Sequence, residues 1–222
     1  MSGIYSWRFA DSSSKRKSAT TFNLFEVMFV EPHIGRGISG RSGWIEVVCG
    51  SMFSGKTEEL IRRLTRALIA NQHVEIFKPA IDKRYDKKKI VSHKDSAIES
   101  SPVNFANDIL LRVSDCEVVG IDEAQFFDDE IVNVVDELAN QGKRVIVAGL
   151  DMDFKGRPFK PMDSLMSIAE YITKVHAVCM KCGSVASYSH RRTKSKQTIV
   201  LGEKDVYEAL CRNCFFEARA QQ

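Results

Sequence analysis

Residues 50–57 read GSMFSGKT, and they constrain the fold of this chain more than any other segment. They match the phosphate-binding pattern GxxxxGK[ST] at every fixed position. The mostly apolar run Trp44–Cys49 comes directly before them, and a helical pattern follows. A glycine-rich turn between a strand and a helix points several backbone N–H groups, and the positive end of the helix dipole, at an anion. The segment therefore predicts a nucleoside triphosphate site, in which Lys56 reaches the β- and γ-phosphates and Thr57 offers its hydroxyl to Mg²⁺.

Short apolar runs alternate with helical patterns after this loop. Alternation of this kind is typical of a parallel sheet covered by helices on both faces. It stops near Val178, where we expect a change of domain. The polar stretch Asp82–Ser101 reads as a long loop. The expected strands are Trp44–Cys49, Val74–Phe77, Val118–Ile121 and Val145–Gly149, and the expected helices are Lys56–Asn71 and Asp129–Asn140.

The first of these helices shows a clear amphipathic pattern. Its apolar residues recur at helical spacing and should face the sheet, whereas its arginines should lie on the other side. The apolar set is Leu60, Ile61, Leu64, Leu68 and Ile69, and the basic set is Arg62, Arg63 and Arg66.

Length and charge limit the kinds of partner. A chain of 222 residues can form one domain with a small appendage. Residues 1–43 hold six basic and three acidic residues, which accounts for the whole formal charge of +3 and leaves the rest neutral. A neutral body argues against nucleic-acid binding, and no apolar stretch approaches the roughly 18 residues that a membrane helix needs. We therefore expect a cytoplasmic protein with neither nucleic acid nor membrane as a partner.

Residues 1–43 lack helical or strand periodicity over most of their length, and we expect a mobile N-terminal arm. Scarce acidic residues before Glu26, together with serines and basic residues, are compatible with an organelle transit peptide. A true start at Met28 is the alternative, so the purpose of the arm stays open.

Two carboxylates, Asp122 and Glu123, close the predicted strand Val118–Ile121. Ligand chemistry in α/β sheets gathers at the carboxyl ends of strands. Beside a phosphate loop, one acid at this place can hold Mg²⁺ or its water shell, and the other can accept the proton of an attacking hydroxyl. Without the loop, a pair of solvated acids would be the better interpretation.

Four of the six cysteines form two CxxC pairs, Cys179 with Cys182 and Cys211 with Cys214, and 28 residues separate the pairs. Two such pairs are the geometry by which thiolates hold one tetrahedral Zn²⁺, and four protein ligands make a structural site. Two disulfides are the rival interpretation, which a chain without a secretion signal disfavours. The other two, Cys49 and Cys116, stand beside apolar strand residues and should be buried.

Other residues give weaker signals. Phe126, Phe127, Phe154 and Phe159 are predicted on spacing alone to be core aromatics rather than a base-stacking pocket. The basic runs Lys87–Lys89 and Arg191–Lys196 are interpreted as solvated loop charges.

Taken in order, several segments resemble one enzyme family. They are GSMFSGKT, KPAIDKRY at 78–85, GIDEAQFF at 120–127, GLDMDFKGRPF at 149–159, the two CxxC pairs and IVLGEKDVYEALCRNC at 199–214. Together they resemble thymidine kinases of the bacterial and animal-cytosolic type, from about Trp44 to Phe216. The resemblance implies a P-loop NTPase (RecA-like) parallel sheet over 44–178, followed by a small zinc-ribbon-like lasso domain over 179–222.

The resemblance also implies transfer of the ATP γ-phosphoryl group to the 5′-hydroxyl of thymidine. The implied cofactors are ATP, Mg²⁺ and a structural Zn²⁺, with dTTP as feedback inhibitor of a homotetramer. Glu123 would be the base, and Lys56 and Arg84 would stabilise charge. Nucleotide contacts would come from Gly50, Ser51, Met52, Phe53, Ser54, Gly55, Lys56, Thr57, Asp82, Lys83, Arg84, Asp122, Glu123, Ala124 and Gln125, and thymidine contacts from Met52, Leu150, Phe154, Phe159, Thr198, Ile199, Val200, Leu201, Gly202 and Tyr207.

Three other functions fit parts of the pattern. The sequence Asp122–Gln125 superficially resembles a helicase box, so a nucleic-acid-dependent ATPase with a zinc ribbon is one alternative. A zinc-containing small-molecule kinase such as an adenylate kinase is another, although its cysteine pairs would interrupt the core as a lid. A purely structural module is the third.

Overall fold

The computed structural model describes residues 43–82, 89–91, 97–113, 115–193 and 206–221. Six of its strands form one parallel sheet in the order β5-β2-β6-β7-β1-β8. The order places β7 between β1, which leads into the phosphate loop, and β6, which leads into the acidic pair. The strands are β1 (Trp44–Gly50), β2 (Val74–Pro79), β5 (Ser101–Val103), β6 (Val118–Ile121), β7 (Arg144–Leu150) and β8 (Tyr171–Val175).

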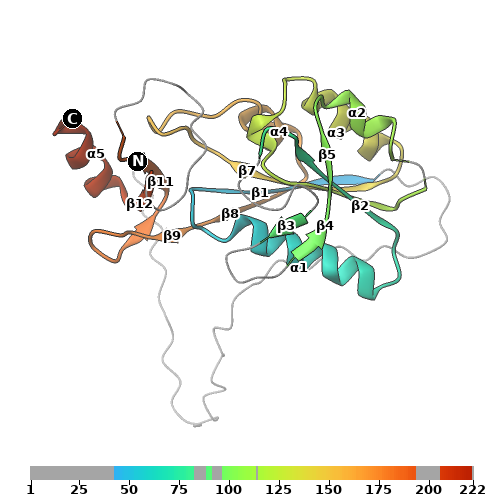
Figure 1. Cartoon of the computed structure of the whole chain (residues 1–222), viewed down its shortest axis with the longest axis horizontal. Helices are drawn as coiled ribbons and strands as arrows, with labels where there is room; N and C mark the ends of the chain where they lie inside the picture. The colour runs from blue at the N-terminus through green and yellow to red at the C-terminus, as the bar shows by residue number, and fades with distance from the viewer. Residues whose placement is uncertain (1–42, 83–88, 92–96, 114, 194–205, 222) are drawn as a thin grey trace, which may run out of the picture. The chain divides into compact units, whose positions relative to one another are not determined.

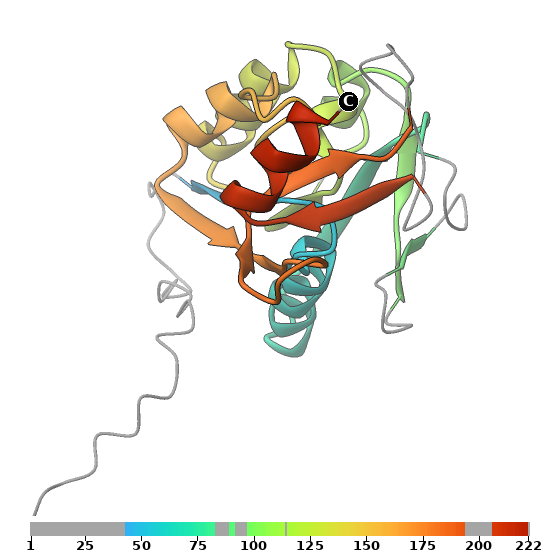
Figure 2. The same cartoon turned by 90° about the vertical axis from the view of Figure 1, so that its left-hand side faces the viewer.

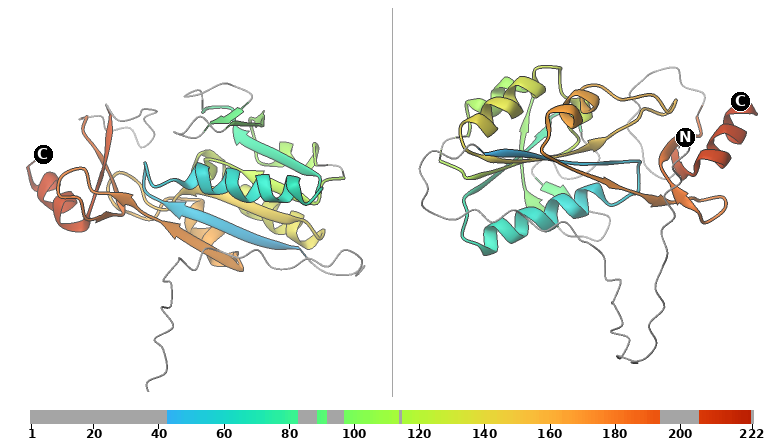
Figure 3. Two further views of the ribbon diagram at one scale, coloured as in Figure 1. Left: turned by 90° about the horizontal axis from the view of Figure 1, so that it is seen from below. Right: turned by 180° about the vertical axis from the view of Figure 1, so that it is seen from behind.

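Helices cover both faces of this sheet, as Figure 1 shows and Figure 3 repeats from below and behind. On one face α1 (Lys56–Ile69) buries Leu60 and Leu64 against β1, β6 and β7. On the other face α2 (Asn107–Leu110), α3 (Ile131–Asn140) and α4 (Met162–Ile168) pack over a second apolar cluster. The predicted parallel sheet with helices on both faces is confirmed.

The segment after β8 forms smaller elements around a third cluster of buried residues. We call this segment, from β9 to α5, the cysteine lobe; Figure 2 shows it toward the viewer. Its antiparallel pairs are β9 (Ala177–Val178) with β10 (Val185–Ala186), and β11 (Tyr188–Arg191) with β12 (Tyr207–Leu210), followed by α5 (Arg212–Ala220). The exact domain boundary at 178/179 stays a prediction.

One expectation about secondary structure was wrong, and one strand of the sheet's edge was missed. The stretch Asp82–Ser101 is not wholly a loop, because β3 (Lys89–Val91) pairs antiparallel with β4 (Ala97–Glu99) and β5 begins at Ser101. The parallel edge strand β8 has no counterpart among the expected strands. Its residues are mostly exposed or half-buried, so it lacks the apolar run that marks the inner strands.

Helix α1 differs from its amphipathic prediction at both polar and apolar positions. Leu68 and Ile69, at its carboxyl end, are exposed, with 47% and 76% of their surface accessible. Arg63, expected on the solvent side, is 0% exposed and ion-pairs with Glu46 of β1 and with Glu59, at 2.8 Å each. A buried guanidinium needs such compensation, because an unpaired buried charge costs several kcal/mol.

Glu46 is the centre of this buried network. Both of its oxygens accept from Arg144 of β7, at 2.7 and 3.2 Å, and Oε1 also accepts from the Trp44 indole at 2.8 Å. Arg63 reaches Thr173 of β8 at 2.8 Å. The network therefore connects α1, the helix that follows the phosphate loop, to three neighbouring strands, β7, β1 and β8.

Candidate active site

The phosphate loop has the glycines that its backbone demands. Gly50 ends β1 with φ +152°, and a Cβ there would lie 2.2 Å from the Val175 carbonyl oxygen of β8, so a side chain is excluded. Gly55 adopts the left-handed region, with φ +87°, at the residue before α1. No side chain caps this helix start. An uncapped helix N-terminus behind a glycine turn is suited to an anion.

Lys56 lies against the loop that it follows. Its side chain is buried, and Nζ donates to the Ser51 carbonyl at 2.8 Å. The Ser54 hydroxyl donates to the same carbonyl at 2.7 Å. The ammonium group is therefore held over the turn, where a triphosphate would need positive charge.

Asp122 and Thr57 meet across the sheet edge, as the sequence predicted for an Mg²⁺ site. The Thr57 hydroxyl donates to Asp122 Oδ2 at 3.3 Å. Burial, together with the nearby carboxylates of Glu123 and Asp82, raises the pKa of Asp122 to about 7, although the Glu123 N–H and Lys56 act to lower it. The Asp122 carboxylate and the Thr57 hydroxyl are hard oxygen donors of the kind that Mg²⁺ prefers, and a cation would relieve the repulsion between Asp122 and its acidic neighbours.

Glu123 is held by its neighbours in an uncommon backbone conformation. Its φ of +51° lies in the left-handed region, which non-glycine residues seldom adopt. The Glu123 N–H donates to Asp122 Oδ1 at 2.9 Å, and its carboxylate accepts from the Gln125 amide. Gln125, in the short 3₁₀ helix η1 (Ala124–Phe126), is fixed in turn because its Oε1 accepts from the Leu150 N–H at 2.9 Å.

Of the predicted thymidine residues in 150–159, Leu150 is the last residue of β7, and Phe154 and Phe159 lie on the tight hairpin that follows it. Met152 and Pro158 form an antiparallel bridge, and the Phe159 N–H donates to the Asp151 carbonyl at 3.1 Å. Phe154 stands at the turn and is half-buried. Phe127, by contrast, belongs to the buried core, so the expectation of core aromatics is confirmed for Phe127.

Arg191 was wrongly interpreted as a solvated loop charge. It belongs to β11, is 2% exposed, and its guanidinium carbon lies 3.6 Å from the centroid of the Phe154 ring. Its Nε also donates to the Tyr207 hydroxyl at 3.2 Å. Arg191 thus joins two predicted thymidine residues, Phe154 and Tyr207, that come from different parts of the chain. A basic run gives no sequence signal for such a contact.

Ser189 is a second residue that the sequence analysis missed. It precedes Arg191 by two positions on β11, and its Oγ accepts from the Met52 N–H of the phosphate loop at 2.9 Å. Neither of its neighbours in sequence hints at this contact. The cysteine lobe therefore contacts both the phosphate loop and the hairpin that carries Phe154.

The four predicted metal ligands come together. The sulfur atoms of Cys179, Cys182, Cys211 and Cys214 all lie within 4.8 Å of one another, and those of Cys182 and Cys211 are 3.6 Å apart. A tetrahedral zinc–thiolate site requires sulfur separations of about 3.8 Å. No disulfide joins any of the six cysteines in the structure, which favours the metal site over the two-disulfide alternative, and Cys49 and Cys116 are buried as predicted.

Some predicted site residues lie outside the described part of the chain: Lys83, Arg84, Thr198, Ile199, Val200, Leu201 and Gly202. The N-terminal arm over residues 1–42 lies outside it as well. Within the described ranges, no helix has both the length and the apolar character needed to cross a membrane.

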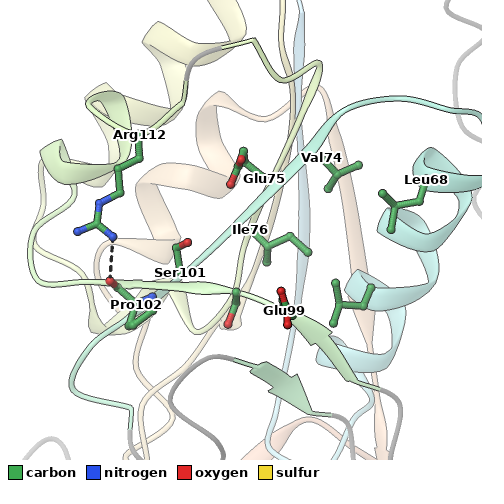
Figure 4. A pocket seen from close by; sticks show the side chains of 10 residues that line it. Leu68, Val74, Glu75, Ile76, Glu99, Ser101, Pro102 and Arg112 are labelled. Carbon is green, nitrogen blue, oxygen red and sulfur yellow. Dashed lines mark hydrogen bonds between the residues drawn. The ribbon is translucent and has the colours of Figure 1, made fainter.

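A separate hollow of about 650 Å³ lies by the amino-terminal half of β2. Figure 4 shows Leu68, Val74 and Ile76 on one side of it and Arg112 on the other. The hollow is lined from β2 by Val74, Glu75 and Ile76, and none of the predicted site residues lines it. The hollow is therefore distinct from the candidate active site.

Comparison with known proteins agrees with the geometry at the carboxyl edge. The sequence profile of the family described as thymidine kinase matches residues 43–215. The chain belongs to the thymidine kinase family. A curated thymidine kinase of Bacteroides thetaiotaomicron is 57% identical over 195 residues, which cover 88% of this chain and 97% of that protein. One of Rhodothermus sp. is 57% identical over 188 residues, covering 85% and 88%, and one of Porphyromonas gingivalis is 60% identical over 175 residues, covering 79% and 86%.

Membership of the thymidine kinase family accounts for the phosphate loop and the acidic pair as parts of one kinase site. The matched residues 43–215 include the phosphate loop, the acidic pair and both cysteine pairs, and Thr57 of the loop lies within hydrogen-bond distance of Asp122. The helicase-like interpretation of Asp122–Gln125 is therefore not needed to explain the acidic pair.

Proposed function

We propose that this protein transfers the γ-phosphoryl group of ATP to the 5′-hydroxyl of thymidine. The contact between Thr57 of the phosphate loop and Asp122 of the acidic pair carries the proposal, together with family membership. Thr57 of the donor site is hydrogen-bonded to Asp122, and Asp122 directly precedes the proposed base, Glu123. Phosphoryl transfer requires mainly this kind of positioning and charge stabilisation.

In the proposed reaction, the loop Gly50–Thr57 binds the triphosphate, and Lys56 neutralises charge that develops on the transferred group. Thr57 and Asp122, with Asp82 nearby, would hold Mg²⁺, which when bound would supply positive charge to the phosphates. Glu123 accepts the proton of the 5′-hydroxyl as the oxygen attacks the γ-phosphorus, whose bond to the bridging oxygen of the departing ADP breaks. Ala124 and Gln125 shape the turn that presents Glu123, and Lys83 and Arg84 are proposed to lie by the phosphates.

The acceptor pocket is proposed to form between the hairpin after β7 and the cysteine lobe. Phe154 would stack on the thymine base, and Arg191 supports that ring from behind. Met52, Leu150 and Phe159 would complete the apolar wall, while Tyr207 and residues 198–202 would cover the base. Inhibition by dTTP, a homotetrameric assembly and a cytoplasmic location are proposed from the same family resemblance.

The direct test of this function is phosphoryl transfer from labelled ATP to a panel of nucleosides and nucleotides, with and without dTTP. We expect thymidine to be the best acceptor and dTTP to inhibit. AMP as the better acceptor would support an adenylate-kinase-like enzyme instead. ATP turnover that rises with DNA and not with thymidine would support a nucleic-acid-dependent ATPase.

We further propose that the four cysteines hold a structural Zn²⁺, because their sulfur atoms all lie within 4.8 Å of one another, close enough to bind one metal ion. Chelation, or Cys211→Ser, should lower the midpoint of thermal unfolding by at least about 5 °C, since structural zinc binding is coupled to folding. Differential scanning calorimetry with parallel zinc determination measures this.

Two additions complete the zinc experiment. Restoring Zn²⁺ to the chelated protein should restore the midpoint, whereas restoring Mg²⁺ alone should not. Thymidine affinity should fall in the same samples, because Tyr207 lies on β12, close in sequence to Cys211. A zinc-free preparation with an unchanged midpoint and full thymidine affinity would refute the structural site.

A further inference from the structure

Two hydrogen bonds connect the cysteine lobe to Ser51 and Met52, near the beginning of the phosphate loop. The Met52 N–H donates to Ser189 Oγ at 2.9 Å, and the Ser51 hydroxyl donates to the Ala186 carbonyl at 3.5 Å. Ser51 and Ser189 are both buried, with 2% and 4% of their surface accessible. Water therefore has little access to the two serine hydroxyls, and loss of the Ser189 hydroxyl would leave the part-buried Met52 N–H without this partner.

The shorter bond acts on one particular peptide group. The Met52 N–H and the Ser51 carbonyl belong to the same planar unit, so they point in opposite directions. On the carbonyl side, that unit accepts from Lys56 Nζ at 2.8 Å and from the Ser54 hydroxyl at 2.7 Å. On the N–H side, it is held by Ser189. A hydroxyl of the cysteine lobe thus fixes the orientation of the carbonyl that positions the phosphate-loop lysine.

We propose that Ser189 is a positioning residue for the triphosphate donor site. By accepting from Met52, Ser189 holds the 51–52 peptide in the orientation that places Lys56 and keeps the loop curved around an anion. The cysteine lobe thereby contributes to binding of the donor, in addition to its proposed role over thymidine. The inference rests on the proposed function only in that the loop binds a triphosphate.

Equilibrium binding without thymidine tests this role independently of chemistry. Ser189→Ala should weaken binding of a non-hydrolysable ATP analogue with Mg²⁺ about 5-fold, the usual effect of losing one buried hydrogen bond. Ser189→Thr keeps the hydroxyl and should bind within about 2-fold of the wild type. Inorganic tripolyphosphate, used as a competitor, should lose affinity by the same factor as the ATP analogue, because the effect lies at the phosphates.

Ser187→Ala is the matched control, since Ser187 lies on the same lobe but its hydroxyl contacts exposed His176 instead of the loop. This variant should bind the ATP analogue as the wild type does. The proposal is overturned if Ser189→Ala retains wild-type affinity. It is also overturned if alanine and threonine weaken binding equally, or if tripolyphosphate affinity is unchanged. Failure of the wild type to phosphorylate thymidine would count against the proposed function and leave these binding results interpretable.

Discussion

Replacing Glu123 by glutamine should slow phosphoryl transfer to thymidine at least about 100-fold in a single turnover, the lower range for loss of a positioned proton acceptor. The glutamine amide cannot accept the proton that leaves the 5′-hydroxyl. Single-turnover measurement is needed, because product release limits kcat in many enzymes and would hide part of the effect.

The substitution should leave the local geometry in place. Gln125 cannot turn its amide around freely, because its Oε1 accepts from the Leu150 N–H. Its amide nitrogen therefore continues to face residue 123, where a glutamine oxygen accepts as the carboxylate did. The loss then reports the missing base and not a displaced loop.

Two measurements separate the chemical effect from general damage. The variant should bind the ATP analogue with Mg²⁺ within a few-fold of the wild type. Glu130→Gln changes an exposed carboxylate a few residues along the chain and should transfer phosphate at the wild-type rate. The expected loss is about 100-fold. If the single-turnover rate of Glu123→Gln is instead within about 3-fold of the wild-type rate, the assignment of Glu123 as the base is refuted.

The parts of the fold that the sequence predicted are those with a local signal. The phosphate loop is a contiguous pattern, and the inner strands β1, β2, β6 and β7 are short apolar runs because both of their faces are covered. The acidic pair was placed correctly because a strand's carboxyl end is also a local property. Its close contact with Thr57 followed from the parallel sheet, which brings such ends to one edge.

The missed features depend on contacts between distant segments. Arg63 looked like a surface residue because helical periodicity assumes that charges face water, whereas its partner Glu46 comes from a strand 17 residues earlier. Arg191 and Ser189 have polar neighbours in the sequence and show no strand pattern. They nevertheless belong to β11, which pairs with β12 some 16 residues later in the chain. From β11, Ser189 contacts the phosphate loop and Arg191 contacts Phe154. Edge strand β8 has too little buried surface to produce an apolar run.

Replacing Glu46 by glutamine should destabilise the fold by about 3 to 5 kcal/mol, because it leaves the buried guanidinium groups of Arg63 and Arg144 without their common counter-charge. The volume of the side chain is nearly unchanged, so the loss is electrostatic and not a packing defect. One of the two carboxylate oxygens also becomes an amide donor that faces a guanidinium. Unfolding in urea, monitored by circular dichroism, measures the change.

Glu137→Gln provides the matched control, since Glu137 accepts an exposed hydrogen bond from Gln141, just after α3, and should alter stability by less than about 0.5 kcal/mol. Combining Glu46→Gln with Arg144→Gln should cost less than the sum of the two single changes, because the second change removes one of the stranded charges. If Glu46→Gln shifts the urea midpoint no more than Glu137→Gln, the network does not stabilise the fold. A large shift with a negative coupling energy would instead identify this charge cluster as the connection that holds α1, and with it Lys56, on the sheet.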